Sequence, residues 1–595
     1  MPSQTDTLLL PAVKRKPARS APGLRQSWLM ELALLLMAGI GVARIVSTYR
    51  VFSQTTDEPA HVAAGMEWLE RGTYTFEPLH PPLARIADAL GPYLSGLRLK
   101  NNQGLWIEGN ELLLARNQYL HNLSLARLGV LPFFLVATFI VWYWARERYG
   151  DWPALAATFL FTTSPVVLAH SGLATTDMAA TATFTWALFS YVQLLEKSTY
   201  ARSSTFGVAA AVAILSKFSA LVFLPASGIT LLLTRWLMGR RTEKRAHTAS
   251  SISWPRAVAI AAVVMMLVVW AGYRFAMSSV TDAQLRPHYV IDQFVGASGT
   301  LHNAAYAVAE LPLVPAPALF QGLAKVRFKE TVGHKSYFLG QVRQTGWWYF
   351  FPVALAVKST IPFLLFVGIG TYCLGKSLWQ QRRSWIDVAP VIAALTVLLA
   401  CMPSHINIGT RHILPIYPVL AIIGGVGACR LWSALRPKYV GIALTLTLLA
   451  WQLTSSISVH PDYLAYFNVL AGKQPERVLI DSDLDWGQDL LRLSAALHQR
   501  NVQQVSIAYA GSSKLDLARF GLPSFQLLGP HQLATGWIAI SLLQLKTGGL
   551  GLPDDSFSWL EAYKPAALVG RSIRLYYVPE YREGQSRSVS NSQIQ

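Results

Sequence analysis

The most constraining feature of this sequence is a long series of apolar segments separated by short basic connections. A helix needs about 20 apolar residues to cross a hydrocarbon core of about 30 Å. The chain has 595 residues, of which 52% are apolar and 14% charged, which is too apolar for an ordinary soluble protein. We therefore predict a predominantly α, polytopic membrane protein of about 11 transmembrane helices. The expected spans cover residues 27–48, 123–145, 153–171, 175–195, 205–217, 219–237, 256–275, 348–375, 387–402, 412–432 and 438–456.

The basic residues predict how the chain is oriented in the membrane. Short cytoplasmic connections carry an excess of Lys and Arg. With eleven spans, every short basic connection falls on the side of residues 1–26, which we predict to be a disordered cytoplasmic tail. The two long loops, 49–122 and 276–347, and the region 457–595 then lie outside the cytoplasmic (inner) membrane. The net charge of +19 is spread between apolar spans, where orientation and anionic membrane lipids account for it, so we expect no nucleic-acid partner.

The C-terminal region differs in pattern from the spans. Residues 457–595 alternate strand-like runs (477–481, 505–510, 537–543 and 573–578) with helical ones (488–500 and 557–563), which predicts a small extracytoplasmic α/β domain beside the membrane domain 27–456. Its segment from Ile480 to Asp489 contains four acids and Trp486. This segment could bind a cation or contact a glycan, with Trp486 as a stacking surface, or it could be a loop before a capped helix. We predict an accessory or acceptor-facing role for the domain.

Ionisable residues cluster in the first outer loop. Asp57-Glu58-Pro59-Ala60-His61 opens a predicted helix over 59–71, and His80-Pro81-Pro82-Leu83 opens a second one over 82–94. Two acids at a helix N-terminus are favoured in their ionised forms, which suits a base or a metal ligand, although they could simply cap the helix. Arg85 lies in the first turn of the second helix, where the helix dipole disfavours a cation, so a nearby anion such as a phosphate is a candidate partner.

This arrangement resembles a known family. An apolar span, an outer Asp-Glu pair, a surface helix and then His-Pro-Pro-Leu is similar to the protein O-mannosyltransferase family, glycosyltransferase family 39, and its relatives that modify lipid A with aminoarabinose. The resemblance covers about the first 430 residues and is most specific between Thr55 and Arg85. It implies the C-type fold of membrane glycosyltransferases, a sugar donor linked to a polyprenyl phosphate, an inverting displacement and an acidic residue of the first outer loop as catalytic base.

Further residues outside the first outer loop are candidates for the same site. Asp177 resembles the second acidic position of these transferases, and Lys217 the lysine that reaches the lipid phosphate; a helix cap and a snorkelling lysine are the alternatives. Lys358 lies deep in the predicted span 348–375, and an intramembrane charge is a functional hypothesis by default. Arg411 and His412 resemble the Arg-aromatic-x-Leu-Pro signature of related transferases, with His412 where the signature has Tyr.

We therefore predict an inverting glycosyltransferase of the cell envelope, such as an enzyme of protein O-linked glycosylation, that moves a sugar from a polyprenyl phosphate to a protein, lipid or glycan hydroxyl. The alternatives are a transporter or flippase of a lipid-linked sugar, which Lys358 favours, and a glycan ligase or polymerase. A divalent cation (Mg, Mn or Zn) on Asp57 and Asp177 is a candidate cofactor, although no ligand spacing requires it. The predicted site comprises the base Asp57, with Glu58 second, and the substrate-binding residues His61, His80, Arg85, Asp177, Lys217, Lys358 and Arg411.

Overall fold

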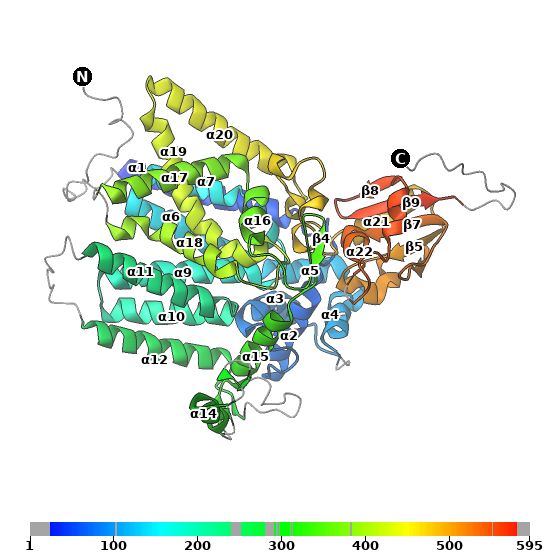
Figure 1. Cartoon of the computed structure of the whole chain (residues 1–595), viewed down its shortest axis with the longest axis horizontal. Coiled ribbons are helices and arrows are strands. Elements are labelled where there is room, and N and C mark those ends of the chain that lie inside the picture. The colour runs from blue at the N-terminus through cyan, green and yellow to red at the C-terminus, as the bar shows by residue number, and fades with distance from the viewer. Residues whose placement is uncertain are drawn as a thin grey trace.

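The computed structural model describes residues 24–100, 104–239, 252–279, 291–292, 295–296, 298–309, 311, 313–380, 384–549 and 551–579. Most of the predicted tail 1–26 and the last residues of the C-terminal region lie outside these ranges. The described part of the chain forms a helical bundle with a small domain at one end (Figure 1). It contains eight helices that are long and apolar enough to cross a membrane, or nine if one bent pair counts as a single span.

The long helices of the bundle follow the predicted spans closely. The bent pair is α7 and α8, which meet at 61°. Their bounds are α1 Leu24–Val46, α5 Tyr119–Leu128 continuing into α6 Leu131–Tyr149, α7 Asp151–Thr162, α8 Pro165–Ser171, α9 Thr176–Glu196, α11 Ala220–Gly239, α12 Trp254–Gly272, α17 Ile361–Trp379, η4 Thr410–Ile416 continuing into α19 Tyr417–Ala434, and α20 Lys438–Ser458.

Three predicted spans have a different form. The spans 205–217 and 387–402 are helical, as α10 (Tyr200–Ser216) and as η3 (Trp385–Val388) with α18 (Ala389–Cys401), but both are shorter than the eight helices that are long enough to cross a membrane. The prediction of one continuous span over 348–375 is wrong. The chain forms α16 (Phe350–Lys358) and α17, and between them Ser359 and Thr360 are extended, with the Thr360 side chain accepting a hydrogen bond from the Phe363 amide at 3.4 Å. A proline at the second position of α17 reinforces this new start.

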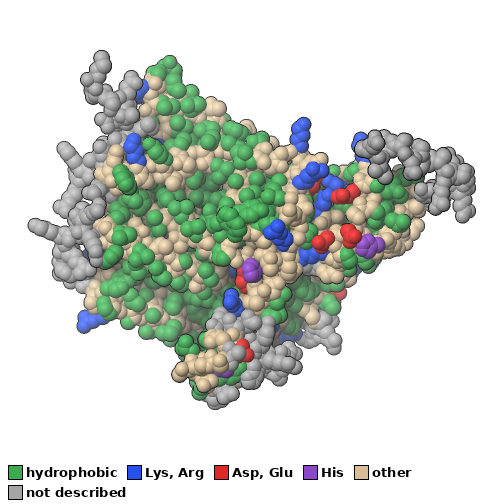
Figure 2. Space-filling model, viewed as in Figure 1, with side chains coloured by type: hydrophobic (Ala, Val, Ile, Leu, Met, Phe, Trp, Pro, Cys, Tyr) green, Lys and Arg blue, Asp and Glu red, His purple; other side chains and the backbone are tan. Residues whose placement is uncertain are grey.

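Burial distinguishes inner helices from outer ones. In the most apolar stretch of α9, 83% of the residues are buried, and in that of η4 with α19 the share is 89%. In α1, α11 and α12 the corresponding share is 17%. The outer helices present large apolar side chains, and the visible face of the bundle is broadly hydrophobic while charged side chains gather over the C-terminal domain (Figure 2). Exposed apolar surface on this scale requires lipid around it. The chain is a multi-pass membrane protein.

Several short elements lie at the end of the bundle that carries the C-terminal domain, except that α14 lies at the lower edge of the view, below α12 and α15 (Figure 1). The helices predicted over 59–71 and 82–94 are confirmed as α2 and α3. They approach closely at Gly65, where a Cβ atom would lie 1.9 Å from the carbonyl oxygen of Arg85. The elements are α2 Glu58–Arg71, α3 Pro82–Leu94, α4 Leu105–Leu113, α14 Thr300–Ala309, α15 Pro317–Val332, and the antiparallel pairs β1 Met277–Ser278 with β2 Val314–Pro315 and β3 Ser336–Phe338 with β4 Gln341–Arg343.

The C-terminal region is built on a five-stranded sheet of order β6-β5-β7-β9-β8. Strands β6, β5 and β7 are parallel, and β9 runs antiparallel to both β7 and β8. The predicted strands 505–510, 537–543 and 573–578 are confirmed, but 477–481 forms 3-10 turns with a single bridge between Leu479 and Phe338. The elements are α21 Leu490–Gln499, β5 Gln504–Ala508, β6 Ser524–Leu527, β7 Gly536–Ser541, α22 Leu542–Thr547, β8 Ala567–Val569 and β9 Ile573–Val578.

Candidate active site

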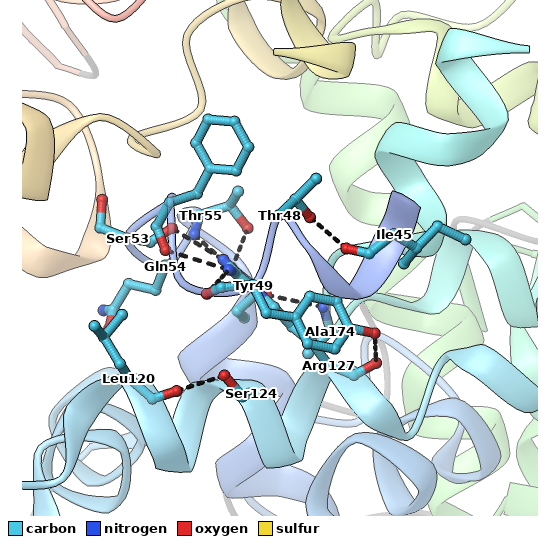
Figure 3. A network of polar contacts seen from close by, with 12 residues as sticks. Ile45, Thr48, Tyr49, Ser53, Gln54, Thr55, Leu120, Ser124, Arg127 and Ala174 are labelled. Carbon is cyan, nitrogen blue, oxygen red and sulfur yellow. Dashed lines mark hydrogen bonds and ion pairs between the residues drawn. The ribbon is translucent and has the colours of Figure 1, made fainter. Parts of the chain in front are cut away.

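The segment that leads into α2 is held by a buried ion pair. Glu58 and Arg127 are both fully buried, and the Arg127 guanidinium donates from Nε to Oε1 at 2.8 Å and from Nη2 to Oε2 at 2.9 Å. The amides of Thr55 and Ala174 also donate to the Glu58 carboxylate, at 2.7 and 2.9 Å. Figure 3 shows the chain from Thr48 to Thr55 folded around Arg127, whose guanidinium also donates to backbone carbonyls of that segment.

These contacts bear on two sequence predictions. Both oxygens of Glu58 are occupied by a cation and by backbone amides, so its geometry fits a structural anchor and does not fit a base that must meet a substrate. Arg127 was missed by the sequence reasoning. Its signal was present, because an arginine inside the apolar stretch 119–149 is costly unless it is paired or functional.

Asp57 has a different environment from its neighbour. Its side chain is 26% exposed, and Oδ2 accepts a hydrogen bond from Nη1 of Arg411 at 2.6 Å. The side chain of Asp57 makes no capping hydrogen bond to α2, so the helix-cap alternative does not hold for it. Burial by itself would raise the pKa of Asp57, but the Arg411 guanidinium and His61 outweigh it and hold the pKa below the ordinary value. Asp57 is therefore an ionised carboxylate that solvent can reach.

Asp177 and Lys217 form a second pair beside the first. Lys217 Nζ contacts Asp177 Oδ1 at 2.6 Å, and the Thr175 hydroxyl donates to Oδ2 at 3.1 Å. Asp177 is buried at the start of α9, whereas the Lys217 side chain, between α10 and α11, is 15% exposed. Asp177 is also close enough to Asp57 and Arg411 for its charge to affect the pKa of each. The structure thus brings two predicted acids and two predicted cations into one neighbourhood.

The two histidines of the first outer loop are neutral and lie together. The His61 and His80 rings meet edge to face, 5.2 Å apart. Burial, followed by the charge of Arg85, lowers the pKa of His61 to about 3. Burial also lowers the pKa of His80 well below its ordinary value, and Arg85, His61, Lys217 and Lys329 add to that effect. Burial is the largest cause of both low pKa values, and the nearby cations add to it by making the local potential positive.

Arg85 is buried, and its anionic partner comes from the protein. Nη2 of Arg85 pairs with Glu77 Oε2 at 2.6 Å, and Nη1 donates to the Glu77 carbonyl and the Tyr74 hydroxyl at 2.6 and 3.1 Å. Nε donates to Nδ1 of His61 at 3.0 Å, which leaves the ring proton of neutral His61 on Nε2. The prediction that Arg85 meets an anion is correct in kind, but Glu77 supplies that anion, and Arg85 orients His61.

Lys358 also differs from its prediction. It ends α16 and is buried, and its Nζ donates to the carbonyl oxygens of Leu464 and Asp483 at 2.7 and 2.6 Å. Nζ also lies 4.2 Å from the centre of the Phe467 ring. The partners of Lys358 are backbone carbonyls of the chain after the last span, so this lysine fastens that chain to the bundle.

The acidic segment of the C-terminal region packs against the site. Trp486 is buried, and its ring lies 4.3 Å from the guanidinium carbon of Arg411. This contact shows that Trp486 is no open stacking surface for a glycan. Asp483, Asp485 and Asp489 each accept hydrogen bonds from protein groups, including the Thr410 hydroxyl, the Leu543 amide and the Ser572 hydroxyl. Asp481 is close enough to Arg411 and Asp57 for their charges to affect its pKa.

The residues at the site do not fit the predicted divalent cation. Among the residues that the structure describes, no group of three or more His, Cys, Asp or Glu side chains is placed to hold a metal ion. Asp57 and Asp177 are each neutralised by a protein cation at 2.6 Å. A metal shared by these two acids would have to displace Arg411 and Lys217.

Comparison with known proteins defines the class. Residues 121–270, which include Asp177 and Lys217, match the family model described as dolichyl-phosphate-mannose-protein mannosyltransferase. No curated protein sequence matches the chain. The apo oligosaccharyltransferase of Archaeoglobus fulgidus has a TM-score of 0.51 and 12% identity, over 91% of this chain and 73% of that one. The S. cerevisiae protein O-mannosyltransferase Pmt1-Pmt2 complex bound to the sugar donor has a TM-score of 0.51 and 12% identity, over 73% of this chain and 90% of that one. ArnT from Cupriavidus metallidurans bound to undecaprenyl phosphate has a TM-score of 0.47 and 12% identity, over 92% of this chain and 98% of that one.

The fold is that of the C-type membrane glycosyltransferases. Together with the match of residues 121–270 to the mannosyltransferase family model, it supports a glycosyltransferase that is similar to the family 39 type. The resemblance found in the sequence is thereby confirmed for the fold and for the enzyme class.

Proposed function

We propose that this protein moves a sugar from a polyprenyl phosphate to an acceptor hydroxyl, with inversion, on the outer face of the inner membrane. One observation carries the proposal: Asp57 is an ionised, solvent-reachable carboxylate held by Arg411, next to the Asp177–Lys217 pair. Among the described residues, Oδ1 of Asp57 accepts no hydrogen bond, so this oxygen can receive a proton. The family match and the shared fold support a lipid-linked donor of this kind.

The chemistry follows from the charges at the site. The acceptor oxygen attacks the anomeric carbon, the bond from that carbon to the phosphate oxygen breaks, and its electron pair leaves with the phosphate. The hydroxyl proton passes to Asp57. A carboxylate in this role contributes roughly 10²- to 10⁴-fold to the rate. Attack from the face opposite the phosphate inverts the anomeric centre.

The departing phosphate gains one negative charge, and the site supplies the matching potential. The low pKa of His80 reflects burial and the nearby cations Arg85, Lys217 and Lys329. Arg85 and Lys217 are already in ion pairs with Glu77 and Asp177. Lys329 is exposed on α15 and forms no ion pair with any residue that the structure describes. We propose that Lys217 and Lys329 stabilise the leaving phosphate, while Arg411 holds the base.

The transporter alternative loses its main support. It rested on Lys358 as an intramembrane charge for a substrate or an ion, and Lys358 is engaged by the carbonyls of Leu464 and Asp483. The acids and cations of the site also gather at one end of the bundle, and a transporter places its site near the bilayer midplane.

The test of the proposed function is a transfer assay in proteoliposomes with a panel of synthetic polyprenyl-phosphate hexoses and pentoses. We expect the wild type to release polyprenyl phosphate and Asp57→Asn to do so about 10²-fold more slowly or worse, because Asn cannot accept the proton. The matched control is Asp88→Asn. Burial raises the pKa of Asp88 well above its ordinary value, so Asp88 is neutral and Asn preserves its charge. Unchanged release by Asp57→Asn would refute the base assignment, and absence of release from any donor would refute the donor class.

A further inference from the structure

Residues 481–490, here called the clamp segment, hold the chain on the Asp57 side of the site. The amides of Ser53 and Thr56 donate to the carbonyls of Gln488 and Trp486 at 3.0 and 2.9 Å. The Thr56 hydroxyl donates to the same Trp486 carbonyl at 3.2 Å, and the Leu490 amide donates to the Ser53 hydroxyl at 3.1 Å. The residue immediately before Asp57 is therefore fixed to the clamp segment through both its backbone and its side chain.

The same segment holds the chain on the Arg411 side. The Thr410 hydroxyl and amide donate to the Asp483 carboxylate, at 2.6 Å and at 3.1 and 3.2 Å to its two oxygens. The Ser482 hydroxyl donates to the Ile408 carbonyl. Lys358 fixes the clamp segment in turn, because it donates to the carbonyl of Asp483.

Trp486 adds a direct contact to the functional pair. Its ring lies against the Arg411 guanidinium, and the buried Nε of Arg411 has no hydrogen-bond partner in the described structure. The guanidinium is thus located by Asp57 on one side and by the aromatic face on the other. A cation–π contact is stronger when it is shielded from water, as this one is.

We propose that Trp486 is a positioning residue of the transfer reaction, which orients Arg411 so that Asp57 stays ionised and correctly aimed, and that the clamp segment is the part of the C-terminal region that completes the site. This inference rests on the proposed function. It gives the C-terminal region a role inside the reaction, in addition to any contact with the acceptor.

The experiment measures kcat, KM and the pH dependence of kcat in the proteoliposome assay for Trp486→Leu, Trp486→Phe and Thr410→Val. We expect Trp486→Leu to lower kcat about tenfold, which corresponds to about 1.4 kcal/mol. An Arg411 guanidinium that is held less firmly lowers the pKa of Asp57 by a smaller amount, so that pKa rises. The acidic limb of the dependence of kcat on pH then moves to higher pH. Trp486→Phe keeps an aromatic face and retains most of kcat, and Thr410→Val shifts the limb in the same direction as Trp486→Leu.

The pH readout separates positioning from mere folding, because loss of folded protein lowers the amplitude of the profile without moving its limb. Other titratable groups interact electrostatically with Asp57 or Arg411 and could also move this limb. Among the described residues they include His61, His170, Asp177, His334, His412, Asp481 and Asp483. The control is Trp537→Leu, which removes a half-buried tryptophan that packs on Tyr577 in the sheet; we expect its limb to stay in place. An unshifted limb in both Trp486→Leu and Thr410→Val would overturn the inference while the proposed function stands. A wild type that transfers no sugar would overturn both.

Discussion

Two adjacent carboxylates at one helix start differ completely in what they can do. Glu58 has both oxygens occupied by Arg127 and by backbone amides, whereas Asp57 shares one oxygen with Arg411 and meets solvent. The difference comes from direction alone, since the first turn of α2 sends successive side chains to different sides. Sequence reasoning identified the pair and ranked Asp57 first, but it could not show that Glu58 faces Arg127, which lies 69 positions away.

The anchor role of Glu58 predicts a stability defect. Glu58→Gln leaves a buried guanidinium without its counter-ion, which we expect to cost about 3–5 kcal/mol of unfolding free energy. Thermal unfolding in detergent should show a large fall in the midpoint. The double variant Glu58→Gln/Arg127→Met should recover part of that loss, because no unpaired buried charge remains. A Glu58→Gln protein as stable as the wild type, yet inactive, would instead make Glu58 a catalytic group.

Helices α2 and α3 place the first-loop residues through a close contact at Gly65. Because an added Cβ would lie 1.9 Å from the backbone oxygen of Arg85, Gly65→Ala must separate the two helices. We expect a marked loss of transfer activity, with Asp57 and His61 displaced from Arg411 and Arg85. Gly39→Ala in α1 is the matched control, since a Cβ there meets nothing within 4 Å. Circular dichroism melts and the transfer assay together measure both variants, and equal activity in the two would contradict this account of the helix crossing.

Elements with a strong local signal were predicted well. The long apolar stretches predicted the long helices, and the prolines Pro59 and Pro82 predicted where α2 and α3 start. The break at Ser359 and Thr360 was missed because the apolar residues on both sides of it were read as one span. The polar run Lys358-Ser359-Thr360 and Pro362 mark it in the sequence, and the Thr360 cap and the docking of Lys358 mark it in the structure. Strands β6 and β8 were missed because they are short strands at the two edges of the sheet.

At the scale of the whole molecule, the interface between the bundle and the C-terminal domain contains acids that prefer to be protonated. Burial raises the pKa of Asp481 and of Asp485 to about 7. Between the unfolded carboxyl pKa of about 4 and this value, the folded state binds more protons than the unfolded one, so stability falls as pH rises through that window. We expect a higher unfolding midpoint at about pH 5 than at about pH 8, with a smaller difference in Asp485→Asn. A midpoint that rises with pH over this range would contradict the protonated state.

The orientation of the molecule is a separate prediction. The positive-inside rule places the C-terminal sheet outside the cytoplasm. Ser524 is exposed at the start of β6, so Ser524→Cys should react with a membrane-impermeant maleimide in cells whose inner membrane is intact. Cys373 and Cys401 are buried and Cys429 is half-buried, which keeps the background of the wild type low. Labelling that requires lysis of the inner membrane would reverse the proposed topology.

The Asp57–Arg411 pair also has a consequence for biogenesis. Its members are 354 positions apart, and the segment that fixes both is made later still. A nascent chain that has already inserted its last span carries the acid and the guanidinium without the loop that aligns them. The pair would therefore stay unaligned until residues 481–490 have been synthesised and have packed against the bundle.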